Sequence, residues 1–343
     1  MASAPTRTRN VYVVGAGLSC ALGFPTTTML LREVLDLTAR HRRHREALVA
    51  RLASAFRFFY PAGDHEGYAP DPVDFFSMLR AYLHLGADLP GGFRDAAALH
   101  RALKFAMAQL LLEAGRRCDA TLAAGHDYLD ELLQPGNVVI TSNWDLLLER
   151  YAQLHGRPLR LSGAGRDDTI VLLKLHGSVD WCLGRHARRS RPDEQFSVLS
   201  ERLFGPGSRR RRLPPPDARA DLPMRIRALE EPMGWNNILR QCATELYMVT
   251  MARGKTGDVA PLHQIWRDAY RAVSGPGRLE LVGYSMPEDD VEIRTLLRAG
   301  AQRGASRPQV IVRNPDGRAH SRVRECLDGE VASDYRAVSG ATA

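Results

Sequence analysis

Residues 11–19 read VYVVGAGLS, and the predicted fold rests mainly on this stretch. Its apolar, mostly β-branched start is typical of a parallel strand buried on both faces. Its small residues Gly15, Ala16 and Gly17 would let the backbone come close to a pyrophosphate, which the N-terminus of a following helix also favours. The dinucleotide fingerprint of dehydrogenases would need glycine at position 20, where this chain has Cys20. The stretch therefore predicts either a phosphate-binding loop or a tight strand-to-helix turn without a ligand.

Four more short apolar runs are predicted as strands along the rest of the chain. They cover residues 137–141, 170–175, 279–282 and 310–312. Segments with the helical spacing of apolar residues lie at about 29–37, 146–154, 261–273 and 289–298. Strands that alternate with helices predict an α/β fold with a doubly wound, Rossmann-like parallel sheet.

One domain over residues 1–330 is expected to contain this sheet, with two interruptions. Residues 41–133 have a mostly helical pattern over about ninety residues, which is long for a crossover and predicts a helical insertion or subdomain. Residues 183–225 are rich in proline and arginine, which predicts a surface loop. Residues 331–343 are expected to be a frayed C-terminal tail.

Composition narrows the class of protein. The chain has 343 residues, of which 44% are hydrophobic, and this is enough for a sizeable core. No run approaches the roughly 20 apolar residues of a membrane helix, and residues 1–10 lack the apolar core of a secretory signal. The five cysteines are scattered without a CxxC pair, which argues against a disulfide framework and a structural zinc site. We therefore predict a cytoplasmic protein that does not associate with a membrane.

The formal net charge of +8, from 47 basic and 39 acidic residues, is concentrated in one stretch. Between Arg185 and Arg225 the chain has 11 arginines against 5 acidic residues, a local excess of 6. The rest of the chain is nearly balanced, so the charge belongs to the predicted loop more than to the fold. A solvated loop is the ordinary explanation. Contact with a nucleic-acid backbone is the alternative, and it predicts strongly salt-dependent binding.

Polar side chains collect in the loops that follow the predicted strands. In an open parallel sheet a ligand binds beyond the carboxyl ends of the strands. After the first loop come TSNWD at 141–145, HGS at 176–178 and GYSMP at 283–287. Asn143 and Asp145 can both face a ligand, and His176, directly after a buried strand, is a candidate general base. Helix capping, a structural histidine and an ordinary turn are the alternatives for these loops.

The four loops together, in this order, resemble the sirtuin family. GAGLS, TSNWD, KLHGS and GYSMP, followed by a late strand and Asn314, match that family's order of motifs. The resemblance is closest to the bacterial sirtuin-like NAD-consuming proteins of antiphage defence. These carry G-F-P-T after the first loop, as at residues 23–26, and G-Y-S-x-P late in the chain. The matching segments span from about Val11 to Asn314, nearly the whole chain.

The resemblance implies that the chain binds NAD, and it gives each matched residue a role. The diphosphate and its neighbouring ribose would lie against Gly15, Ala16, Gly17 and Ser19. The adenosine side would be lined by Gly283, Ser285 and Asn314. Asn143 would orient the nicotinamide ribose and a water, and Asp145 would hydrogen-bond the nicotinamide carboxamide. His176 would act as the general base toward a ribose hydroxyl.

The resemblance also implies the reaction. Sirtuin deacylases carry a zinc module of two CxxC pairs after the catalytic histidine, where this chain has its arginine- and proline-rich stretch, with Cys182 and Cys242 far apart. The missing module argues against acyl-lysine as substrate and favours an NAD glycohydrolase that forms ADP-ribose and nicotinamide, without zinc. A protein deacylase or ADP-ribosyltransferase is one alternative, and a non-enzymatic module that senses NAD or ADP-ribose is another. The defence relatives stay inactive until they assemble or receive a signal, which implies a homo-oligomer, a partner such as a helicase-type ATPase, or both.

Overall fold

The computed structural model describes most of the chain. The described residues are 10–40, 46–63, 69–86, 89, 96–162, 168–183, 196–198, 245–275, 277–304, 307–327 and 331–333.

A seven-stranded, entirely parallel sheet forms the centre of the molecule, in the order β10-β9-β8-β1-β2-β4-β3. Its strands are β1 (Asn10–Val14), β2 (Val138–Thr141), β3 (Leu159–Arg160), β4 (Ile170–Lys174), β8 (Arg278–Val282), β9 (Gln309–Arg313) and β10 (Val331–Ser333). The chain winds from β1 toward β3 and then returns to the other side of β1 through β8. This arrangement confirms the predicted doubly wound α/β fold, and it puts the switch in strand order between β1 and β8.

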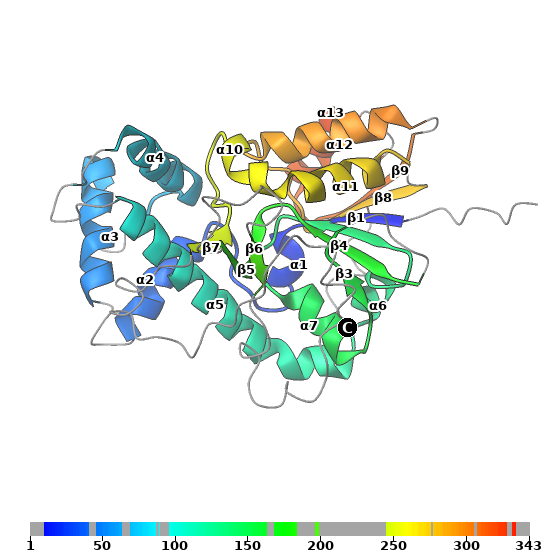
Figure 1. Cartoon of the computed structure of the whole chain (residues 1–343), viewed down its shortest axis with the longest axis horizontal. Helices are drawn as coiled ribbons and strands as arrows, with labels where there is room; N and C mark the ends of the chain where they lie inside the picture. The colour runs from blue at the N-terminus through cyan, green and yellow to red at the C-terminus, as the bar shows by residue number, and fades with distance from the viewer. Residues whose placement is uncertain are drawn as a thin grey trace, which may run out of the picture.

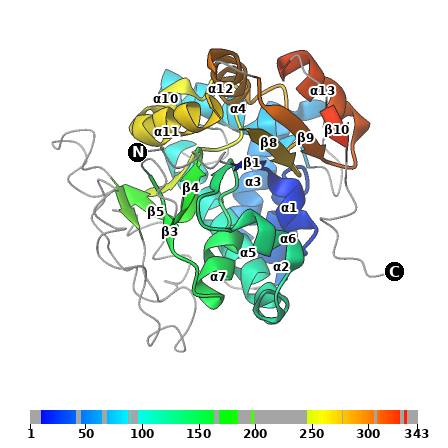
Figure 2. The same cartoon turned by 90° about the vertical axis from the view of Figure 1, so that its right-hand side faces the viewer.

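Both faces of the sheet are buried, as the unbroken apolar strand sequences require. On β1, Tyr12 and Val14 pack into one hydrophobic cluster, whereas Val11 and Val13 pack into another on the opposite face. Figures 1 and 2 show the helices in two layers around the sheet. One layer has α11 (His263–Val273), α12 (Val291–Arg303) and α13 (Gly317–Leu327), and the other has α1 (Ala16–Cys20), α6 (Asp127–Leu132) and α7 (Leu147–Leu154). Among the described residues, no helix is both long and apolar enough to cross a membrane.

The first crossover contains a group of helices that extends to one side of the sheet in Figure 1. It consists of α2 (Leu30–Arg40), α3 (Glu46–Phe59), η1 (Pro61–Gly63), α4 (Pro72–Leu85) and the long α5 (Ala96–Ala124). Edge-to-face contacts between aromatic rings on α3 and α4, such as Phe56 with Phe75 at 4.9 Å between centroids, join the helices. Asp71 caps α4 by accepting a hydrogen bond from the backbone N–H of Asp74.

A second, three-stranded antiparallel sheet was not predicted from the sequence. Its order is β6-β5-β7, from β6 (Phe196–Val198), β5 (Gly177–Leu183) and β7 (Glu245–Met248). Residues 196–198 are therefore a strand inside the segment 183–225 that was predicted as a loop; the rest of that segment beyond Leu183 lies outside the described residues. Likewise β10 forms in the stretch predicted to be a frayed tail, because it extends the parallel sheet beside β9.

One charged cluster lies in the core beside the central strands. Glu280, in the middle of β8, has no exposed surface and accepts hydrogen bonds from Tyr128 at 2.6 Å and from the guanidinium groups of Arg278 and Arg313. The neighbouring phenol of Tyr12 is also buried, and burial together with the Glu280 charge raises its pKa to about 12. Two guanidinium groups and a phenol thus compensate the buried carboxylate.

Candidate active site at the carboxyl ends of the strands

The glycines of the first and fourth loops pack directly against one another. The backbone N–H groups of Gly15 and Gly17 donate to the carbonyl oxygens of Val282 and Gly283, each at 2.9 Å. A Cβ atom on Gly17 would lie 2.7 Å from the Cα of Gly283, which itself has a φ of +57°. Glycine is therefore needed here so that the β1 and β8 loops can touch, a packing reason in addition to the predicted approach of a ligand.

The second loop joins the first through a chain of hydrogen bonds. The side-chain amide of Asn143 donates to the carbonyl of Gly15 and to the hydroxyl of Ser19, each at 3.1 Å. Ser19 in turn donates to the buried carboxylate of Asp145 at 2.8 Å. Asp145 also accepts from the backbone N–H of Leu147 at the start of α7, at 3.1 Å, so it helps to begin that helix as well. The structure thus brings together four residues that were predicted separately.

One atom of this network remains available. Within the part of the chain that the structure describes, no hydrogen bond uses the Oδ1 atom of Asn143, and the residue is only half-buried. Because its Nδ2 donates to two acceptors, the orientation of the amide is fixed, and so is the direction in which Oδ1 points. A fixed acceptor of this kind can orient a water or a sugar hydroxyl.

A buried lysine fixes the second loop to the third. The Nζ atom of Lys174 donates to the carbonyl of Asp145 at 2.6 Å, to Glu149 at 2.8 Å and to the hydroxyl of Ser178 at 2.9 Å. Its side chain is 1% exposed. Lys174 was not predicted as a site residue. Its place at the end of a buried strand, two residues before His176, was the available signal.

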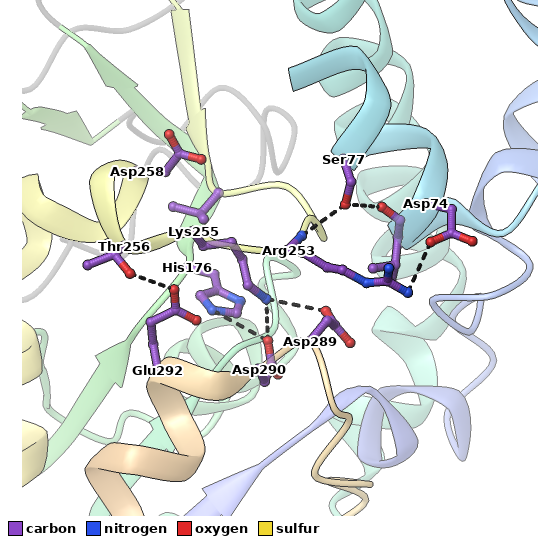
Figure 3. A network of polar contacts seen from close by, with 12 residues as sticks. Asp74, Ser77, His176, Arg253, Lys255, Thr256, Asp258, Asp289, Asp290 and Glu292 are labelled. Carbon is purple, nitrogen blue, oxygen red and sulfur yellow. Dashed lines mark hydrogen bonds and ion pairs between the residues drawn. The ribbon is translucent and has the colours of Figure 1, made fainter. Parts of the chain in front are cut away.

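His176 is buried, and its Nε2 atom has no hydrogen-bond partner among the residues that the structure describes. That nitrogen lies 3.9 Å from Oδ1 of Asp290, which precedes α12 (Figure 3). Burial is the main cause that lowers the pKa of His176 to about 4; Asp290 raises it and Lys255 lowers it. The imidazole is therefore neutral at pH 7 and can accept a proton.

An ion pair stands beside this histidine. Lys255, which precedes α10 (Thr256–Val259), is hydrogen-bonded to Asp290 and lies 3.5 Å from a carboxylate oxygen of Asp289. The other oxygen of Asp290 accepts from the hydroxyl of Tyr284 at 3.1 Å. Neither Lys255 nor Asp290 was assigned a role from the sequence. Both are far from His176 along the chain, and only the fold brings them together.

The segment that carries Lys255 is also held by helix α4, as Figure 3 shows. The backbone N–H of Arg253 donates to the hydroxyl of Ser77 at 2.9 Å, and its guanidinium lies 3.2 Å from Asp74. Arg80 pairs with Asp258 at 3.1 Å. The helical insertion therefore contacts the chain on both sides of the lysine.

Ser285 and Asn314 lie at the same edge of the sheet but not in this network. The carbonyl of Ser285 accepts from the guanidinium of Arg322 at 3.0 Å. The side-chain oxygen of Asn314 accepts from the backbone N–H of Asp316 at 3.0 Å, which forms the turn before α13. In the described ranges, no hydrogen bond links either residue to Asn143 or His176.

The prediction that zinc is absent stays a prediction. Across the residues that the structure describes, no group of three or more histidine, cysteine or acidic side chains could hold a metal ion. Cys182 lies in β5, and Cys242 lies outside the described residues.

Comparison with known proteins gives little further guidance. No protein-family model and no curated protein matches the chain. Several solved structures are similar to it, and two of them are sirtuin structures. One is Sir2 in complex with the inhibitor EX-527, 2′-O-acetyl-ADP-ribose and a deacetylated p53 peptide, at 13% identity and a TM-score of 0.36, covering 96% of this chain and 89% of that one. The other is a sirtuin from work on the structural basis of sirtuin substrate affinity, at 14% identity and a TM-score of 0.35, covering 98% and 90%. TM-scores this low define no residue-by-residue correspondence, so function must be argued from the site itself.

Proposed function

We propose that the chain binds NAD at this edge of the sheet and hydrolyses the nicotinamide–ribose bond. The observation that carries the proposal is the buried, neutral imidazole of His176 after β4, beside the strand that leads into the Asn143–Ser19–Asp145 network. A base, an oriented amide oxygen and a carboxylate are the groups that attack of water on a sugar carbon requires.

Hydrolysis consumes one water and yields nicotinamide, ADP-ribose and a proton. Nicotinamide leaves with the electron pair of its bond to ribose C1′ and so becomes neutral, while C1′ becomes oxocarbenium-like. In the proposal, Oδ1 of Asn143 orients the attacking water. The proton that the water loses passes through a ribose hydroxyl to His176, the general base toward that hydroxyl, and from His176 to solvent. Asp145 has lone pairs left for the nicotinamide carboxamide, because a carboxylate can accept about four hydrogen bonds.

The remaining predicted residues have supporting parts in the proposal. Ala16 and Gly17 begin α1, half-buried and exposed respectively, and are assigned to the diphosphate together with Gly15. The hydroxyl of Ser19 is already engaged by Asn143 and Asp145, so we assign it to holding those two side chains. The adenosine side is assigned to Gly283, Ser285 and Asn314.

The resemblance to the defence branch of the sirtuin family supports a wider proposal. NAD depletion by this chain would act in the bacterial cytoplasm against phage infection, and a homo-oligomer or a partner such as a helicase-type ATPase would control it. Contact between residues 183–225 and nucleic acid stays a prediction, since those residues lie almost entirely outside the described ones.

The test is incubation of the full chain with NAD and identification of the products by mass spectrometry, at several protein concentrations. We expect nicotinamide and ADP-ribose in equal amounts, and no release by His176→Gln or Asn143→Ala. His84→Gln, at an exposed histidine on α4, is the matched control and should retain wild-type activity. An O-acyl product with an acylated peptide would indicate a deacylase, and binding without turnover would indicate a sensor; either result contradicts the proposal.

A further inference from the structure

On the basis of the proposed function, we propose that Asp290 and Lys255 are positioning residues for His176. The Asp290 carboxylate orients the imidazole and stabilises it once it has accepted a proton. The Lys255 ammonium balances that carboxylate beforehand, so that His176 enters the reaction neutral.

The geometry around His176 is the first support. Its Nε2 atom is buried, has no hydrogen-bond partner within the described part of the chain, and lies 3.9 Å from Asp290, about 1 Å beyond a hydrogen bond. Asp290 is itself fixed from both sides, by Lys255 on one oxygen and by Tyr284 on the other. A small shift of the imidazole therefore brings it onto a carboxylate that is already in place, as in hydrolases where an acidic side chain orients the catalytic histidine.

The choice of lysine is the second support. The chain has only three lysines among its 47 basic residues, and all three are buried: Lys104, Lys174 and Lys255 are 7%, 1% and 1% exposed. Arginine supplies nearly every cation of this chain, but position 255 has lysine. The ammonium group of lysine is more compact than the planar guanidinium of arginine, which would extend farther from the backbone. A buried ion pair contributes little net stability, because desolvation offsets its attraction. A role in tuning the neighbouring histidine accounts for its presence.

The charges that face His176 come from two segments, the start of α12 and the residue before α10, and they oppose one another. Burial lowers the pKa of His176 most; Asp290 raises it, Lys255 lowers it, and Glu292 at the start of α12 raises it. Removal of the lysine should therefore raise the pKa, since a buried carboxylate would then be left to pair with the imidazolium. Removal of the aspartate should lower the pKa further, since the lysine would be left without its nearest counter-charge. An ion pair that does not act on His176 would leave the pKa of His176 unchanged when either member is removed.

The experiment is an NMR titration of the histidine ring nitrogens in the full chain. The His176 resonance is identified among the 11 histidines by its loss in His176→Gln. We expect Lys255→Met to raise the pKa from about 4 by at least one unit, a tenfold change in proton affinity, and Asp290→Asn to keep His176 neutral to lower pH than in wild type. Unchanged values, or shifts in the same direction in folded variants, would overturn the proposal.

Two further variants complete the design. Lys104→Met is the matched control, because it removes another buried lysine. Burial and then the Lys104 charge lower the pKa of His100, so this variant should raise the pKa of His100 and leave that of His176 unchanged. Lys255→Arg retains the positive charge and should keep the pKa of His176 closer to wild type than Lys255→Met does. If Lys255→Met does not fold, Lys255→Met/Asp290→Asn removes both charges together, and its His176 pKa should lie above that of Asp290→Asn.

Turnover of NAD provides an independent readout. In Lys255→Met the acid limb of the pH dependence of kcat/KM should move to higher pH along with the His176 pKa. If wild type releases no nicotinamide but the NMR shifts occur, the proposed function fails and the positioning pair stands. If wild type turns over NAD and the acid limb does not move in folded Lys255→Met, the positioning pair fails and the proposed function stands.

Discussion

Replacing Lys174 by methionine should destabilise the protein and the site together. The substitution removes three hydrogen bonds, to Asp145, Glu149 and Ser178, and it leaves the Glu149 carboxylate without its cation. Loss of one partner from a buried ion pair typically costs about 3–5 kcal/mol. Because the side chain of Glu149 is still 23% exposed, we expect a loss of about 3 kcal/mol at pH 8. That is a large part of the roughly 5–15 kcal/mol of a typical domain.

The pH dependence of this loss gives a sharper test. Burial raises the pKa of Glu149 above its usual range, whereas Lys174 lowers it, so the variant should have the higher Glu149 pKa. A raised pKa in the folded state means that stability is present at low pH and is lost as pH rises through that pKa. The deficit measured by urea unfolding should therefore shrink from pH 8 to pH 5, by up to about 1.4 kcal/mol for each unit in which Glu149 takes up its proton.

The matched variant is Lys174→Met/Glu149→Gln. It removes the charge that Lys174→Met leaves unpaired, so it should be more stable than Lys174→Met alone at pH 8 and should show less dependence on pH. A deficit below about 1 kcal/mol for Lys174→Met, or one that is constant from pH 5 to pH 8, would refute the reasoning, because the ammonium would then not be compensating a buried carboxylate.

Three further predictions follow from the packing and charges. Gly17→Ala should lower the melting temperature and weaken NAD binding, because its Cβ would lie 2.7 Å from Gly283, whereas Gly275→Ala, with open space around it, should do neither. Glu280→Gln should cost several kcal/mol in urea unfolding, because it removes the carboxylate charge that pairs with the buried guanidinium of Arg313; a loss below about 1 kcal/mol would contradict this. Nicotinamide release should persist as pH falls to about 5 and then decline, because the neutral form of His176, with a pKa of about 4, is the active one; a decline centred near 6.5 would refute this assignment.

The strands of the main sheet could be predicted because their sequences leave few alternatives. VYVV, VVIT and IVLLK are short apolar runs that end in glycine or polar loops, and each forms a buried strand. The edge strand β3 has only two residues and β10 only three, too few for a periodic signal. Strand β5 was missed because it begins at Gly177, inside the predicted loop 176–178. Its glycine has a φ of +77° and lets the chain pass close to Tyr247.

The site was predictable only where it lies in local motifs. Asn143, Asp145 and His176 follow strands and are recognisable from their neighbours in sequence. Lys255 and Asp290 have no such signal, because their importance comes from a contact across elements that are far apart along the chain. The glycine pattern was recognised, but the packing contact that it permits involves Gly283, and only the structure reveals that pairing.

The bonds between helix α4 and the segment around Lys255 have a mechanical consequence. Ser77 and Arg80 hold that segment at Arg253 and Asp258, two residues before the lysine and three residues after it. A tilt or displacement of α4 would therefore move the segment that carries Lys255, whose ammonium group is bonded to Asp290. A molecule that displaced α4 would thus change the surroundings of His176 without contacting the imidazole itself.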